Sequence, residues 1–196
     1  MRPLQGVRAL VFVGAAVAFT SGASAVTVTV TAANVATFTP STGFGVTGGA
    51  TLGNATASNS VSGSGRLTGS WDGSRAYAQV YWSGMRVSLP AGTTSATVVL
   101  NLSYDQKLTG GATSFAEIGA AEAAPCNIFA PTQSRLTGRA RTVTLSVRVT
   151  CADLSAGPLE ISASVWATTP ADPPPLGRQA RFDTTVQLDS IEVSTP

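Results

Sequence analysis

The side chains in this 196-residue chain that could carry out acid–base chemistry are carboxylates, because the sequence contains no histidine. Without an imidazole, the usual base of a serine hydrolase is missing, and so is the commonest metal ligand. No glycine-rich phosphate loop followed by lysine occurs, and Gly63-Ser64-Gly65 belongs to a low-complexity stretch rather than a nucleophile elbow. These residue types exclude the common hydrolase and phosphate-binding sites.

Paired carboxylates are the catalytic chemistry that remains, because two acids can hydrolyse a glycosidic bond. The candidate acids are Asp105, Glu117, Glu122, Asp153, Glu160, Asp183, Asp189 and Glu192. Most of them flank expected turns, and no spacing in the sequence brings two together. We therefore expect a protein that is not an enzyme, with a carboxylate-only glycosidase as the catalytic alternative.

Aromatic side chains give a better indication of function. Trp166 lies on the hydroxyl-bearing face of an expected strand, beside Ser162 and Ser164, where a large ring is an exception. Sugar-binding sheets use such rings, because an apolar sugar face stacks on the ring while the sugar hydroxyls meet polar neighbours. The further ligand-binding candidates are Arg75, Tyr77, Gln79 and Tyr81 on one strand face, and Asn101 and Arg148 on the polar faces of two others.

A second interpretation of these rings stays open. Tryptophan and tyrosine are common in strands. Two packed sheets could bury Tyr77, Tyr81, Trp71 and Trp82, with Trp166 covering the edge of the core. The sequence therefore supports either ligand contact or packing for each of these side chains.

The elements that position these residues are strands, because the dominant hydrophobic period is two. Alternating segments cover 26–30, 95–104, 142–151, 159–167 and 180–191, with a strand or two in 75–89 that is broken at Ser83-Gly84. The alanine-rich stretch Phe115 to Ala124 is the one helix candidate, with a turn or two expected. The pattern predicts an all-β fold, an antiparallel β-sandwich.

The stretch from Gly43 to Ser70 is polar and rich in glycine, serine and threonine, with few apolar anchors. It is consistent with a flexible loop or with a weak, two-sided polar edge strand. We expect short strands with mobile connections there.

The N-terminal residues have the pattern of a secretory signal peptide. Arg2 and Arg8 precede an apolar run that ends at Phe19, and Ala23-Ser24-Ala25 forms a small-residue cleavage site. We expect residues 1–25 to be removed, leaving 26–196 as a single secreted domain, with periplasm or cell surface as further destinations; an uncleaved anchor is the alternative. No later stretch approaches membrane-spanning length, so we expect no spanning segment.

The two cysteines, Cys126 and Cys151, predict one disulfide, since an even number of cysteines in a secreted chain indicates disulfide bonding. A thiol pair for metal or redox work is the alternative. The whole chain has 12 basic and 10 acidic residues, and removing Arg2 and Arg8 leaves ten of each. A neutral surface carries no electrostatic footprint for nucleic acid. A single lysine with abundant arginine, alanine and glycine suggests a GC-rich bacterial source.

Two segments carry a family resemblance. Val87–Leu100 resembles the strand, Pro-x-Gly turn and strand of jelly-roll sandwiches of the galactose-binding-like, carbohydrate-binding-module type, and Ala180–Ile191 is similar to their closing strand. The resemblance implies a jelly-roll-like sandwich that binds polysaccharide. It also implies a structural calcium at Asp183, although the second acidic residue usual beside it is Thr184 here; apart from this calcium we expect no cofactor.

The sequence thus leads to two expectations for function. The first is a secreted, non-catalytic β-sandwich that binds carbohydrate or cell-envelope glycan. The alternative is a structural or adhesive extracellular or surface-layer component that self-associates through strand edges, because a polar, weakly specified region such as Gly43–Ser70 is prone to edge pairing.

Overall fold

A computed structural model describes residues 27–29, 37–40, 51–52, 54–59, 63–122, 125–175 and 178–196. The expected signal peptide, residues 1–25, lies outside the described residues. Across the described ranges every regular element is a strand, and no helix there is long and apolar enough to cross a membrane. The expectation of an all-β sandwich is confirmed.

The first layer, called sheet A, has the strand order β10-β7-β12-β5-β4, with β1 paired in parallel to β12 beyond the end of β5. All its other pairings are antiparallel. Its strands are β1 (Thr27–Thr29), β4 (Asn54–Asn59), β5 (Ser64–Ser70), β7 (Ser95–Thr109), β10 (Ala140–Thr150) and β12 (Arg181–Ser194).

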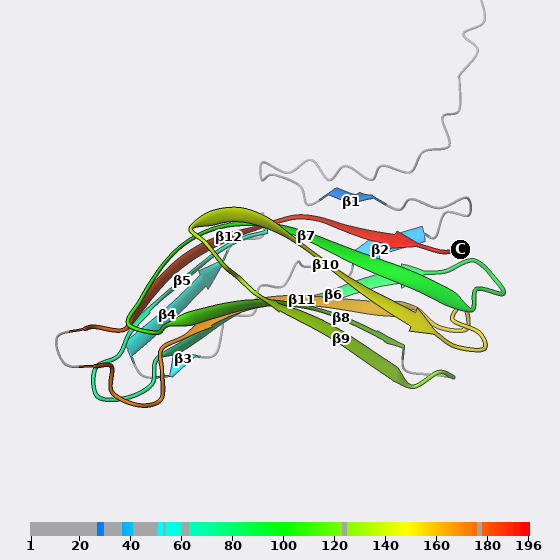
Figure 1. The fold of residues 1–196 in the computed structure, drawn as a ribbon. Coiled ribbons are helices and arrows are strands. Elements are labelled where there is room, and N and C mark those ends of the chain that lie inside the picture. The colour runs from blue at the N-terminus through cyan, green and yellow to red at the C-terminus, as the bar shows by residue number, and fades with distance from the viewer. Residues whose placement is uncertain are drawn as a thin grey trace, which may run out of the picture.

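The second layer, sheet B, has the order β2-β6-β11-β8-β9, with β3 paired to the other end of β6. Its strands are β2 (Thr37–Pro40), β3 (Thr51–Leu52), β6 (Tyr77–Ser88), β8 (Thr113–Glu122), β9 (Ile128–Arg135) and β11 (Leu159–Thr168). The two layers stack face to face, and strands adjacent in the chain often lie in different layers (Figure 1).

The core between the layers is built by the period-two alternation. On β10, Leu145, Val147 and Val149 are buried, whereas Thr144 and Ser146 on the opposite face are exposed. The same alternation on the longest strands buries Trp82, Leu100, Leu102, Ile161, Val165, Phe182, Val186 and Leu188. Branched aliphatic side chains fit a pleated surface with one buried face, so these residues form strands rather than helices.

The helix expected at Phe115 to Ala124 is wrong, because its described part, up to Glu122, belongs to β8 between β11 and β9. The last two residues of that expected helix lie outside the described residues. Ala116, Ile118 and Ala120 face the core, while Phe115 and Glu117 face outward. The alanines favour a helix only weakly, and pairing with two neighbouring strands overrides that preference. The alternation of period two was present, but small side chains on both faces obscured it.

Two other sequence expectations have different outcomes. The break expected at Ser83-Gly84 is wrong, because β6 continues through these two residues. Only the pairing register with β11 changes there, between Ile161 and Ala163. The described parts of the stretch from Gly43 to Ser70 form the short strands β3, β4 and β5, and β4 lies at the edge of sheet A. The expected mobile connections lie outside the described residues.

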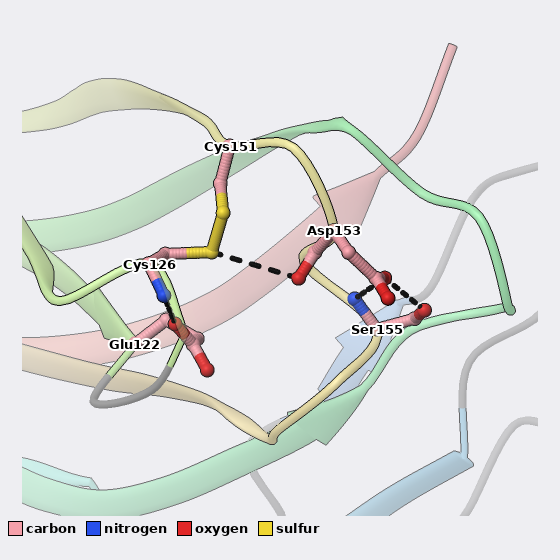
Figure 2. Close-up of a disulfide and its surroundings, with 5 residues drawn as sticks. All are labelled: Glu122, Cys126, Cys151, Asp153 and Ser155. Carbon is pink, nitrogen blue, oxygen red and sulfur yellow. Dashed lines mark hydrogen bonds between the residues drawn. A yellow bond between two sulfur atoms is a disulfide. The ribbon is translucent and has the colours of Figure 1, made fainter.

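The Cys126–Cys151 disulfide is present and joins the two layers (Figure 2). Cys126 lies just before β9 of sheet B, and Cys151 follows directly after β10 of sheet A. The buried carboxylate of Glu122 accepts a hydrogen bond from the backbone N–H of Cys126 at 2.8 Å. The bridge therefore connects sheet A to a cysteine whose backbone N–H is hydrogen-bonded to a buried acid.

A buried polar cluster fixes the loop between β9 and β10. The Gln106 side chain, 4% exposed, donates from Nε2 to the carbonyls of Leu136 at 3.2 Å and Gly138 at 2.9 Å. Its Oε1 accepts a hydrogen bond from the Ser114 hydroxyl. Buried polar groups must be paired in this way, so the cluster holds the loop against the core.

Candidate functional site

The outer face of sheet B carries a broad group of aromatic and polar side chains. It spans β6, β11, β8 and β9, and in Figure 1 both layers bow in the same direction, with this face on the hollow side. We call it the aromatic face and define it by the outward-facing residues Tyr77, Gln79, Tyr81, Phe115, Glu117, Phe129, Gln133, Arg135, Ser164 and Trp166.

Strand register places Trp166 at the centre of this face. It lies opposite Gln79 on β6 and opposite Phe115 on β8, and Phe115 in turn lies opposite Arg135 on β9. The Trp166 and Phe115 rings are stacked, with centroids 5.5 Å apart and planes 16° from parallel. Parallel rings at this distance support each other, so half-buried Trp166 is held in a fixed orientation on the surface.

Tyr77 and its neighbours form the polar border of the face on β6. The Tyr77 hydroxyl donates to Gln79 Oε1 at 2.8 Å, and Arg75 Nε donates to the Thr168 hydroxyl at 2.8 Å. Burial raises the pKa of the Tyr77 hydroxyl, Arg75 opposes the rise, and the charge of Glu117 adds to it. The hydroxyl thus stays protonated and fixes the Gln79 amide, whose NH₂ group keeps its two donors.

Ser164 lies in the middle of the face and is only 7% exposed. It stands between Tyr81 and Glu117 in the strand register. Its hydroxyl has no hydrogen-bond partner among the described residues. Buried hydroxyls in proteins are normally paired, so Ser164 is an exception within this row.

Phe129 extends the face onto the edge strand β9. Its ring is 63% exposed, and no other large hydrophobic side chain is exposed to this degree among the residues described. The ring lies over Gly119, where an added Cβ would come within 3.0 Å of both the Phe129 ring and the Ser162 hydroxyl. Because Gly119 has no side chain, the Phe129 ring can pack directly on the backbone of β8.

The acids of the described region do not form a catalytic pair on this face. Glu117 is at its centre, opposite Ser164 of β11. Glu160 lies four residues further along β11 and forms an ion pair with Arg86 at 2.7 Å. No group of three or more acids or cysteines that could hold a metal ion occurs in the described ranges. The arrangement suits binding by stacking and hydrogen bonding.

The remaining sequence candidates lie on the outer face of sheet A, on the far side of the core from Trp166. Asn101 donates to Ser190 at 2.8 Å and to Glu192 at 3.3 Å, and accepts from Thr144 at 2.8 Å. Arg148 donates to Ser95 at 3.0 Å. Their partners are side chains of the same sheet, so the structure does not bring them into the aromatic face.

Asp183 is also on the outer face of sheet A. Both of its carboxylate oxygens accept hydrogen bonds from Arg66, at 3.1 and 2.9 Å. A guanidinium in place of a second carboxylate does not fit the oxygen-rich site that calcium requires. Asp183 is thus half of an ion pair in this structure, and calcium binding there stays a prediction of the sequence.

Five members of the aromatic face were missed by the sequence reasoning: Phe115, Glu117, Phe129, Gln133 and Arg135. Glu117 was considered only as a catalytic acid. The signal that could have found the others is the same period of two, since Phe129, Gln133 and Arg135 occupy one face of β9. Their meeting with Trp166 depends on strand pairing over long sequence distances, which no local pattern reports.

Known proteins offer limited comparison. No model of a protein family and no curated protein matches the chain. Among solved structures, TmCBM61 in complex with β-1,4-galactotriose is similar at 12% identity over 67% of this chain and 71% of its own, with a TM-score of 0.35. The family 11 carbohydrate-binding module from Clostridium thermocellum, in complex with a mixed-linked tetrasaccharide, is similar at 14% identity over 74% and 89%, with a TM-score of 0.31.

A third similar structure is that of infectious bursal disease virus, Gt strain, at 9% identity and a TM-score of 0.35. It matches 90% of this chain, which spans 39% of the viral chain. With TM-scores this low, none of these likenesses carries an argument about function. Two of these three structures are carbohydrate-binding modules.

Proposed function

We propose that this protein is a secreted, non-catalytic β-sandwich that binds carbohydrate or cell-envelope glycan on the aromatic face. The observation that carries the proposal is the Trp166–Phe115 stack at the centre of that face, with Gln79 and Arg135 at its two ends. The apolar C–H face of a pyranose packs on such rings, and its hydroxyls pair with amide and guanidinium groups at the border. The disulfide supports an oxidising compartment.

Binding without hydrolysis is supported by the placement of the acids. A glycosidase needs two carboxyl groups about 5–10 Å apart on either side of the bond. Here the single central acid is Glu117, and the other described acid near the face, Glu160, is paired with Arg86. An isolated carboxylate surrounded by rings and amides is suited to accept hydrogen bonds from sugar hydroxyls.

Replacing Trp166 with alanine is the test of the proposal. The affinity for glycan should fall about 10- to 100-fold, since an exposed stacking ring contributes on the order of 1–3 kcal/mol. The measurement is affinity electrophoresis and calorimetry of residues 26–196 against galactan, mixed-linked glucan, xylan, mannan and peptidoglycan. Arg148→Ala, at an exposed position on the outer face of the opposite sheet, should bind like the parent protein.

Two results would contradict the proposal. One is an absence of binding to every glycan of the panel by the parent protein. The other is a loss of stability in Trp166→Ala that accounts for the whole loss of binding, because the ring would then serve packing alone.

Ser164→Ala gives a second test of the same face, in which stability and glycan affinity are expected to change in different directions. Removing an unpaired buried hydroxyl should leave stability unchanged or raise it by about 1 kcal/mol, whereas glycan affinity should fall about fivefold. Denaturant unfolding and glycan titration on one sample measure both quantities. Ser146→Ala, at an exposed position of β10, is the control. A Ser164→Ala variant that loses stability without losing affinity would show that the hydroxyl serves the fold.

Assembly into an extracellular layer is the second candidate function. It is favoured by β4, a polar strand at the edge of sheet A whose side chains include Asn54 and Thr56. Edge strands present unpaired backbone groups that another chain can extend. Light scattering across a concentration series tests this function, and a strict monomer at the highest concentration would speak against it.

A further inference from the structure

A groove of about 670 Å³ lies across sheet A, on the side of the molecule opposite the aromatic face. It crosses β4, β5, β12 and β7, which lie side by side in this layer (Figure 1). Its floor consists of two rows of directly paired, outward-facing residues. These rows are Asn54, Ser70, Arg181 and Thr109, and Thr56, Thr68, Asp183 and Lys107.

The charge in this groove is unbalanced. The one carboxylate among its described lining residues, that of Asp183, is fully engaged by the two-point contact with Arg66. Lys107 and Arg181 are exposed, and neither has a carboxylate within ion-pair distance among the described residues. The nearest other acid on β7, Asp105, is paired with Arg139 at 3.8 Å. Two cations therefore point into a ligand-sized groove on a chain whose expected mature charge is zero.

The neutral side chains of the groove are hydroxyls and an amide on rigid strands. The Thr56 and Thr68 hydroxyls are 2.6 Å apart, Asn54 donates to Ser70 at 3.1 Å, and Thr109 donates to the Gln179 carbonyl at 2.9 Å. Each hydroxyl keeps a lone pair or a proton for a further partner. A floor of this kind matches a polyol, and the two cations require that the polyol carry negative charge.

We infer that this groove binds an anionic glycan, an oligosaccharide that bears carboxylate or sulfate groups. Lys107 and Arg181 pair with the anionic groups, and the threonine and serine hydroxyls bind the sugar hydroxyls. Among the described residues that line the groove, the one ring is that of Phe182, which is buried in the core, so stacking contributes nothing here. Binding is therefore electrostatic and weakens with salt, in contrast to binding on the aromatic face.

The test uses three polymers with one backbone: dextran, carboxymethyl dextran and dextran sulfate. The protein carries Trp166→Ala in every measurement, which weakens binding on the aromatic face. Binding by the groove is then measured separately from the proposed function of the aromatic face. At about 50 mM salt, where screening still leaves groove charges effective, we expect retention by at least one charged dextran and none by dextran. Retention by carboxymethyl dextran assigns carboxylates as ligand, and retention by dextran sulfate assigns sulfates.

The variant Lys107→Gln/Arg181→Gln should bind the charged dextran about tenfold more weakly, as expected for two exposed ion pairs lost together. The control, Arg141→Gln/Arg148→Gln, removes the same charge from exposed positions of β10 in the same sheet. An equal loss in the control, undiminished binding by the groove variant, or equal retention by uncharged dextran would each overturn the inference.

Discussion

Replacing Gln106 with leucine should destabilise the folded protein by about 3–5 kcal/mol, since the substitution leaves three polar groups in or beside the core without their partner. These groups are the carbonyls of Leu136 and Gly138 and the hydroxyl of fully buried Ser114. Leucine has a similar volume, so the loss comes from unpaired groups rather than from a cavity. The thermal midpoint should fall by about 10 °C.

Denaturant unfolding measures this effect, with Gln179→Leu as the control, because Gln179 is an exposed glutamine whose side chain carries no such role. The control should change stability by less than about 0.5 kcal/mol. A double variant sharpens the test: Ser114→Ala should cost less in the Gln106→Leu background than alone, because the two side chains form one cluster. Additive costs would contradict the cluster.

Removing the disulfide with Cys126→Ala/Cys151→Ala should cost about 3.5 kcal/mol, the chain-entropy value for cysteines separated by 25 residues. The physical reason is that the unfolded chain gains freedom when the bridge is absent. The bridge is also a covalent side-chain cross-link between the two layers, since Cys151 follows β10 of sheet A and Cys126 precedes β9 of sheet B.

Unfolding of the parent protein with and without a thiol reductant measures the same quantity independently. Reductant should lower the stability of the parent to that of the double variant and should not affect the variant. Equal stability of the variant and the oxidised parent would mean that strain in the native bridge cancels its entropic effect.

The strands with one apolar and one polar face were predictable from the sequence. β7, β10, β11 and β12 combine branched aliphatic residues on one face with hydroxyls and charges on the other, so their alternation is clear. β8 is different, because Ala116, Ala120 and Ala121 contribute small apolar groups to both faces. Nothing local distinguishes such a strand from a helix; its two neighbours decide.

The sequence predicted which residues of the candidate site share a strand face, but it did not predict which strands lie in the same sheet. Alternation placed Trp166 on one strand face and Tyr77, Gln79 and Tyr81 on another, and the structure joins these two faces in sheet B. Alternation could not tell that Asn101 and Arg148 belong to the other sheet, because it identifies the face of a strand and not the layer. That assignment follows from pairings such as β7 with β10 and β12, which are set by the whole fold.

The position of β12 has a consequence for biosynthesis. This strand lies inside sheet A, paired to β7 along nearly all its length and to β5 and β1 on its other side, yet it follows every other described strand in the chain. On the ribosome, β7 and β5 therefore have no template between them until β12 has emerged. Sheet A of the nascent polypeptide therefore stays open until Ser194 has been synthesised, so the last strand of the chain completes this layer.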